Sequence, residues 1–116
     1  MTKREELVFM LGRLITFAEL NEIRFILTSF DRTLEQQMEM YERGVSKCDG
    51  VSNVSRHQVW RAFDIAVLEH DGVVKYKDIP EATLAQYKRL GRYWKSLGGT
   101  WGGDWKSPWD IFHFEI

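Results

Sequence analysis

The sequence predicts a single α+β domain that combines three helices with a small antiparallel sheet. Apolar residues recur three and four positions apart in three segments, and elsewhere every second residue is apolar over a short stretch. The chain has 116 residues, of which 44% are hydrophobic and 28% charged. This length suits one domain and this composition is that of a globular protein, so we place one domain over residues 1–116.

The N-terminal segment predicts an amphipathic helix from about Glu5 to Leu20. Its inner residues recur at helical spacing: Leu7, Leu11, Leu14 and Ala18. Asn21 and Glu22 end this helix, and residues 24–29 read as a short strand.

A second helix is expected to begin at Thr33, which forms a capping-box pair with Gln36. Its inner face is lined by Leu34, Met38 and Tyr41. Gly44 suits the position just after its last turn. Residues 45–56 have no sustained period and predict a loop.

Alternation from Ala62 to Leu68 predicts a strand with two different faces. Its large apolar residues belong to the core: Phe63, Ile65 and Val67. The opposite face carries Asp64 between two alanines, which leaves space beside the carboxylate. A turn at residues 70–72 and a returning strand from Val73 to Tyr76 are expected to complete a hairpin.

A third helix is expected to begin near Asp78, Pro80 and Glu81 and to end at Gly98. Its apolar stripe is Leu84, Tyr87, Leu90, Trp94 and Leu97. Residues 110–116 alternate again and predict a last strand. The core residues of this strand are Phe112, Phe114 and Ile116, and the opposite face carries Ile111, His113 and Glu115.

The charge and the cysteine content indicate which classes of partner are disfavoured and in which compartment the protein is made. The formal net charge of -1 favours neither nucleic acid nor an anionic membrane as a partner. Arg13 and Glu19 interrupt the N-terminal hydrophobic run, so we expect neither a signal peptide nor membrane insertion. Cys48 is the single cysteine, which fits synthesis in a reducing cytoplasm.

Two predicted strands place a candidate metal ligand opposite their core residues, namely Asp64 and His113. His57 precedes Asp64 by seven residues, so a turn could bring both to one point. Two imidazoles and one carboxylate form a ligand set that is typical of catalytic zinc, with a fourth position for water. The pattern alone leaves open a purely structural role for these residues. His70 lies in a predicted turn and reads as a solvated surface residue.

Three motifs resemble the zinc peptidoglycan peptidases, a family that includes D-Ala-D-Ala peptidases and phage L-alanyl-D-glutamate endopeptidases. Residues 55–64, SRHQVWRAFD, resemble the family signature S-x-H-x-x-G-x-A-x-D. Residues 101–107, WGGDWKS, and residues 110–115, DIFHFE, resemble the ending of the endopeptidase branch. Residues 32–44 resemble the segment R-T-x-x-x-Q-x-x-x-Y-x-x-G of the same branch.

The resemblance implies a hedgehog/D-Ala-D-Ala-peptidase-like fold and a role for each matching residue. The implied Zn²⁺ ligands are His57, Asp64 and His113. Asp110 matches the catalytic carboxylate that takes a proton from water, and Arg32 matches the arginine that pairs with the oxyanion. Two plainer readings stay open, because Arg32 could simply pair with Asp31 and Asp110 could be a turn residue before the last strand.

Other residues of the matching motifs have less distinct roles. Substrate contact or scaffolding is expected of Ser55, Gln37 and Trp101, and Trp105 could likewise line the cleft or serve as buried scaffold. Glu115 shares a face with His113 and could support that ligand or act as an alternative base. Trp60 stands where the signature has glycine, so either the local chain tolerates it or the pocket is reshaped.

The resemblance therefore implies a single-domain zinc metallopeptidase that hydrolyses a peptide bond in peptidoglycan stem peptides, with L-Ala–D-Glu as the expected bond. It also suggests a phage or prophage endolysin that is made in the cytoplasm and reaches the cell wall through a partner such as a holin. One alternative is a D,D-carboxypeptidase or dipeptidase of the same fold, although that group more often ends in Glu-x-x-His. Another is a non-catalytic domain that binds zinc or wall peptides.

Overall fold

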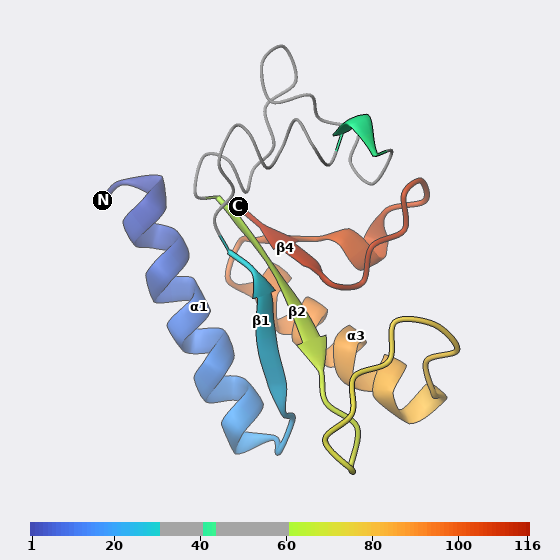
Figure 1. Ribbon diagram of the computed structural model, residues 1–116. Coiled ribbons are helices and arrows are strands. Elements are labelled where there is room, and N and C mark those ends of the chain that lie inside the picture. The colour runs from blue at the N-terminus through green and yellow to red at the C-terminus, as the bar shows by residue number, and fades with distance from the viewer. Residues whose placement is uncertain (31–40, 44–60) are drawn as a thin grey trace.

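The computed structural model describes residues 1–30, 41–43 and 61–116. The elements in this part of the chain are α1 (Lys3–Leu20), β1 (Phe25–Ser29), β2 (Ala62–Val67), α3 (Glu81–Ser96), β3 (Thr100–Trp101), the 3-10 turn η1 (Gly102–Asp104) and β4 (His113–Glu115), as Figure 1 shows. The α+β class is confirmed. The described residues contain two α-helices where the sequence predicts three. Most of the helix expected from Thr33 lies outside the described residues, although Tyr41 and Glu42 are helical.

The four strands form one antiparallel sheet in the order β1-β2-β4-β3. The predicted returning strand from Val73 to Tyr76 is wrong, because β1 and β4 occupy the two edges of β2 where it would pair. Only one isolated bridge, between Leu68 and Val74, remains of the expected hairpin. The turn itself forms at the predicted place, and Gly72 adopts a positive φ of 84° there.

Both helices pack on one face of the sheet. Buried side chains of α1 and α3 form a single cluster with the apolar face of β2: Leu7, Leu14, Phe63, Ile65, Val67, Tyr87, Leu90 and Trp94 belong to it. The ring of Phe63 lies edge-on to Trp94 and stacks on Phe114, with centroids 5.1 and 5.4 Å apart. Figure 1 shows α3 behind the strands. The face of β2 that carries Asp64 is therefore turned away from the helices.

Helix α3 begins within the expected segment, with Pro80 as its N-cap, and Asp78 before it has a positive φ of 51°. One expectation near β4 is corrected. The predicted alternation over residues 110–116 is wrong in its first part. Ile111 is fully buried while Phe112 is only partly buried, because the strand begins at His113 and both residues lie in the turn before it.

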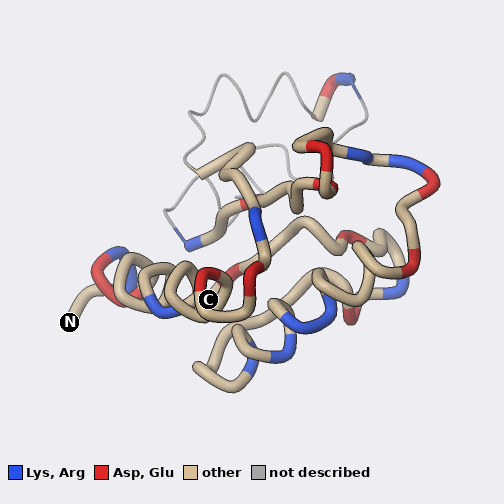
Figure 2. The backbone as a smooth tube through the Cα atoms, turned by 90° about the horizontal axis from the view of Figure 1, so that it is seen from below, with Lys and Arg blue, Asp and Glu red and all other residues tan. Residues whose placement is uncertain are grey.

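Charges of both signs are spread over the described backbone, as Figure 2 shows for α1 and the loops. Among the described helices none combines the length and the apolar composition that crossing a bilayer requires.

Candidate metal centre

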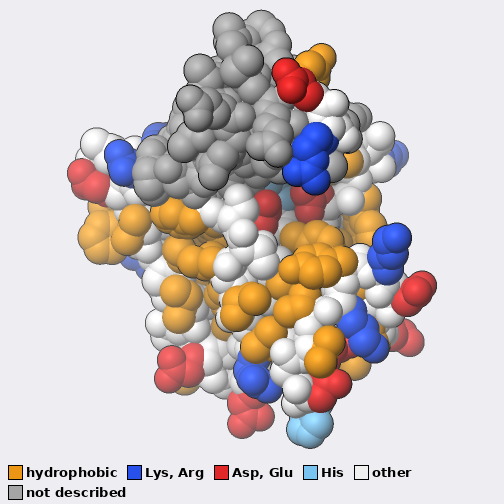
Figure 3. Space-filling view, in the orientation of Figure 1, with side chains coloured by type: hydrophobic (Ala, Val, Ile, Leu, Met, Phe, Trp, Pro, Cys, Tyr) orange, Lys and Arg blue, Asp and Glu red, His pale blue; other side chains and the backbone are white. Residues whose placement is uncertain are grey.

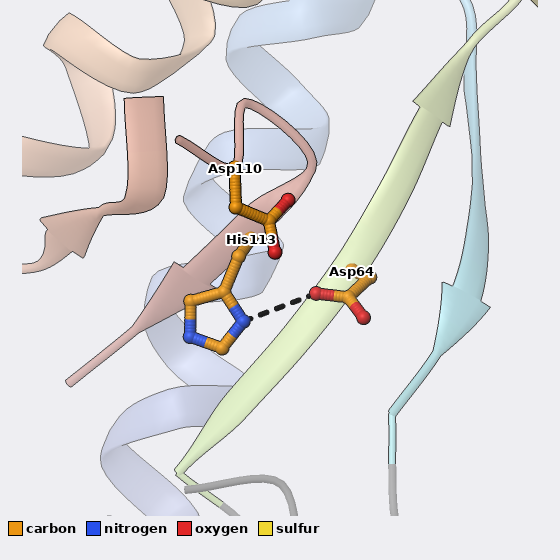
Figure 4. Close-up of side chains that lie close together, drawn as sticks. All are labelled: Asp64, Asp110 and His113. Atoms are coloured by element: carbon orange, nitrogen blue, oxygen red, sulfur yellow. Dashed lines mark hydrogen bonds and ion pairs between the residues drawn. The ribbon is translucent and has the colours of Figure 1, made fainter. Parts of the chain in front are cut away.

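Strands β2 and β4 bring two of the sequence-predicted ligands together. Asp64 and His113 are directly opposite each other in the antiparallel pair, so their side chains share the face away from the helices. His113 Nδ1 lies 3.1 Å from Asp64 Oδ1, and the dashed line in Figure 4 marks this pair. The imidazole is buried, with 9% of the residue exposed, and Asp64 is partly buried. A short cross-strand pair of this kind is rigid, because the backbone of both strands is held in the sheet.

Asp110 completes a cluster of three potential ligands. It lies in the turn before β4, and its Oδ1 accepts a hydrogen bond of 3.1 Å from the backbone N–H of Phe112, which fixes the carboxylate. One ligand atom from each of Asp64, Asp110 and His113 lies within 4.8 Å of the others. This spacing fits oxygen and nitrogen donors around a single metal ion. Figure 3 shows acidic side chains in the middle of this molecular face, bordered by apolar ones.

Glu115 forms a hydrogen bond with the imidazole nitrogen of His113 that faces away from Asp64. Its Oε1 lies 2.8 Å from His113 Nε2, while Nδ1 faces Asp64. A carboxylate on one ring nitrogen fixes the ring orientation and leaves the other nitrogen to act as the ligand. This arrangement supports the reading of Glu115 as a partner of the ligand, and it designates Nδ1 as the donor atom of His113.

Residues of β3 and η1 hold the turn that carries Asp110 in place by hydrogen bonds and close packing. The backbone N–H of Asp110 donates to the carbonyl of Gly102 over 3.1 Å, and the indole N–H of Trp101 donates to the carbonyl of Ile111 over 2.9 Å. A Cβ atom on Gly102 would lie 2.3 Å from the carbonyl oxygen of Asp110 and 3.1 Å from Cβ of His113. Only glycine allows the two segments to approach this closely.

The surroundings of His113 raise the pKa of its imidazole. Burial by itself lowers the pKa of His113, but the hydrogen bonds and negative charges of Asp64 and Glu115 outweigh this and raise the pKa to about 9. The metal-free centre therefore holds a proton on His113 at neutral pH, and this proton must leave when the ring binds a metal.

This shift predicts a pH-dependent stability of the metal-free protein. The folded pKa of His113 lies above its ordinary value of 6.5, so its stabilising contribution is complete below pH 6.5 and is lost as the pH rises through about 9. Melting temperatures in chelator should show wild type losing its advantage over His113→Gln between these pH values. A difference between the two proteins that stays constant from pH 6 to 10 would contradict the shift.

The remaining predicted site residues divide into two groups. Five of them lie outside the described residues: Arg32, Gln37, Ser55, His57 and Trp60. Trp101 is 5% exposed and packs in the core, a position that favours its scaffold use over substrate contact. Trp105 is partly buried and its ring lies 5.0 Å from that of His113, so it forms one wall beside the ligand.

Sequence reasoning missed the structural role of η1 and the short strand β3 before it. Two glycines in succession after Trp101 are the signal that could have indicated a close approach of two backbone segments. It also missed Trp109, which is 56% exposed immediately before Asp110.

Comparison with known proteins places this chain in a family. A model of M15 peptidases, described as D-alanyl-D-alanine carboxypeptidase, matches residues 49–116, more than half of the chain. The chain belongs to the M15 peptidase family. This family consists of zinc enzymes, and its match confirms the resemblance drawn from the sequence motifs.

Individual relatives agree with this assignment. The peptidoglycan L-alanyl-D-glutamate endopeptidase CwlK of Bacillus subtilis is 28% identical over 102 residues, which cover 81% of this chain. The chain spans only 61% of the length of that relative. The crystal structure of the Serratia marcescens L-Ala D-Glu endopeptidase ChiX superposes with a TM-score of 0.71 at 25% identity, covering 97% of this chain and 78% of that one.

A second solved structure shares the fold. It is a mutant of the vancomycin-resistance D,D-pentapeptidase VanY in complex with Zn(II). Its TM-score is 0.66 at 16% identity, and the match covers 96% of this chain and 70% of that one. The expected D-Ala-D-Ala-peptidase-like fold is thereby confirmed.

Proposed function

We propose that this chain is a zinc metallopeptidase that hydrolyses the L-Ala–D-Glu bond of peptidoglycan stem peptides. The observation that carries the proposal is the cluster of Asp64, Asp110 and His113 in a member of the M15 family. The choice of bond is supported by the likeness to CwlK and ChiX, which are described as L-alanyl-D-glutamate endopeptidases, and by the D-x-x-H-F-E ending.

The residues of the cluster suit distinct roles. Asp64 and Nδ1 of His113 would hold the metal, together with His57 as the third ligand predicted from the sequence. Bound zinc would supply an acidified water and polarise the scissile carbonyl. Asp110, held by the N–H of Phe112, would accept the proton of the attacking water and later deliver one to the leaving amine. Arg32 would pair with the oxyanion, as its motif predicts.

Zinc content tests the proposed centre directly. Purified wild-type protein should carry about one zinc per chain, since three protein ligands and one water complete a catalytic site. His113→Ala should lower the bound zinc well below one per chain after dialysis, as measured by elemental analysis. The matched control is His70→Ala, because His70 is exposed in the turn after β2 and should leave the zinc content unchanged. Equal zinc in wild type and His113→Ala would remove His113 from the ligand set.

A D,D-carboxypeptidase is the second candidate, because the matching family model carries that description. The two activities differ in the bond that is cut, so product analysis separates them. Phage origin, cytoplasmic synthesis and release to the wall through a holin stay predictions from the sequence.

A further inference from the structure

Trp109 is a large aromatic residue that is exposed yet held in place. It is 56% exposed, and its indole N–H donates a hydrogen bond of 2.9 Å to the carbonyl of Gly103. This bond ties one edge of the indole to η1 and limits rotation of the side chain. A fixed aromatic ring loses little conformational entropy when a ligand packs on it.

The backbone of Trp109 lies next to the metal centre. It directly precedes Asp110 in the chain, so their Cα atoms are about 3.8 Å apart. The same turn η1 holds both residues, because the N–H of Asp110 donates to Gly102 and the indole of Trp109 donates to Gly103. A ligand that packs on Trp109 would therefore lie near the turn that carries Asp110.

The chemistry of the substrate indicates which of its groups would lie near Trp109. In a peptidoglycan stem, L-Ala is joined through its amine to the lactyl group of N-acetylmuramic acid. The L-Ala–D-Glu bond is thus separated from the sugar by about two residue lengths, or roughly 7 Å when extended. A bond near the D-Ala end is separated from the sugar by about five residue lengths, or roughly 17 Å. Only the first bond brings the sugar within reach of a residue next to Asp110.

We propose that Trp109 is a binding platform for the N-acetylmuramoyl group, whose apolar C–H face packs on the exposed indole. This inference rests on the proposed function and adds to it a specificity for glycan-linked peptides. Trp109 then discriminates between a stem peptide that is attached to muramic acid and one that has already been released from it.

Two substrates with the same peptide test the platform. One carries N-acetylmuramic acid on L-Ala, and the other carries only an acetyl group there, so neither has a charged amine. Trp109→Ala should lower kcat/KM for the muramoyl peptide by up to about tenfold more than for the acetyl peptide. Trp109→Phe retains an aromatic face and should keep most of the preference. The matched control is Phe9→Ala, since Phe9 is similarly exposed, at 55%, but lies on α1.

A binding measurement separates failure of this inference from failure of the proposed function. The indole N–H signal of Trp109 in an NMR spectrum is assigned by its loss in Trp109→Phe. Titration of the zinc-loaded protein with N-acetylmuramoyl-L-alanine should shift this signal, even if no peptide is cleaved. An unshifted signal, or an equal loss of kcat/KM on both substrates in Trp109→Ala, would overturn the platform.

Discussion

Asp110→Asn is expected to abolish most hydrolysis while the protein keeps its zinc. The substitution is isosteric, and the amide oxygen can still accept the N–H of Phe112 that orients Asp110. What is lost is the ability to take a proton from water, and general-base catalysis contributes roughly 10²–10⁴-fold to rate. We therefore expect kcat to fall by about that factor, with the zinc content still near one per chain. Stopped assays on a stem peptide, with elemental analysis of the same sample, measure both quantities.

Asp104→Asn is the matched control for this result. Asp104 lies in the same part of the chain, in η1, but its carboxylate is half exposed and pairs with Lys95 Nζ at 2.8 Å. An exposed pair of this kind contributes little, so its loss should leave both turnover and zinc content unchanged. If Asp110→Asn turns over at the wild-type rate, Asp110 is not the base. If it loses zinc as well as activity, Asp110 serves as a ligand instead.

Gly102→Ala is expected to destabilise the protein and to disturb the metal centre. The new Cβ would lie 2.3 Å from the carbonyl oxygen of Asp110, which is a backbone atom and cannot rotate away as a side chain could. The turn that carries Asp110, and with it the start of β4 at His113, must therefore move. We expect a loss of about 1–3 kcal/mol in the free energy of unfolding, as for other overpacked sites. We also expect weaker zinc binding in competition with a chromogenic chelator.

Gly12→Ala provides the contrast within the same chain. Gly12 lies inside α1, and a Cβ there would have nothing within 4 Å. Alanine in a helix interior is favoured over glycine, so this variant should gain about 0.5–1 kcal/mol and bind zinc as wild type does. Denaturant unfolding of the metal-free proteins compares the two variants. A Gly102→Ala protein with wild-type stability and zinc affinity would show that η1 does not set the position of the cluster.

Local sequence patterns predicted those parts of the fold that depend on local chemistry. The periodicity of α1 and α3 and the alternation of β2 placed these elements within two or three residues of their observed bounds. The returning strand after Gly72 was predicted wrongly, since pairing depends on which edge of β2 is available, and β4 comes from far along the chain. Alternation also failed at Ile111, because a turn rather than a strand holds that residue.

The sequence pattern also predicted part of the candidate metal centre. Alternation alone placed Asp64 and His113 on the faces opposite their core residues, and the register of β2 and β4 confirms that they meet. Asp110 required the family resemblance, because a carboxylate before a strand reads equally well as a turn residue. The support from Gly102 and the tie between Trp109 and Gly103 depend on contacts between η1 and the turn before β4. No periodicity within either segment encodes such contacts.

The most direct test of the proposed function is mass spectrometry of the products that the zinc-loaded protein releases from purified peptidoglycan. Cleavage of the L-Ala–D-Glu bond would leave muramoyl-L-alanine on the glycan and release peptides that begin with D-Glu. We predict these products, and we predict their absence with Asp110→Asn. Release of terminal D-Ala alone would assign the chain to the carboxypeptidase activity, and intact peptidoglycan after incubation with zinc-loaded protein would contradict a peptidase function.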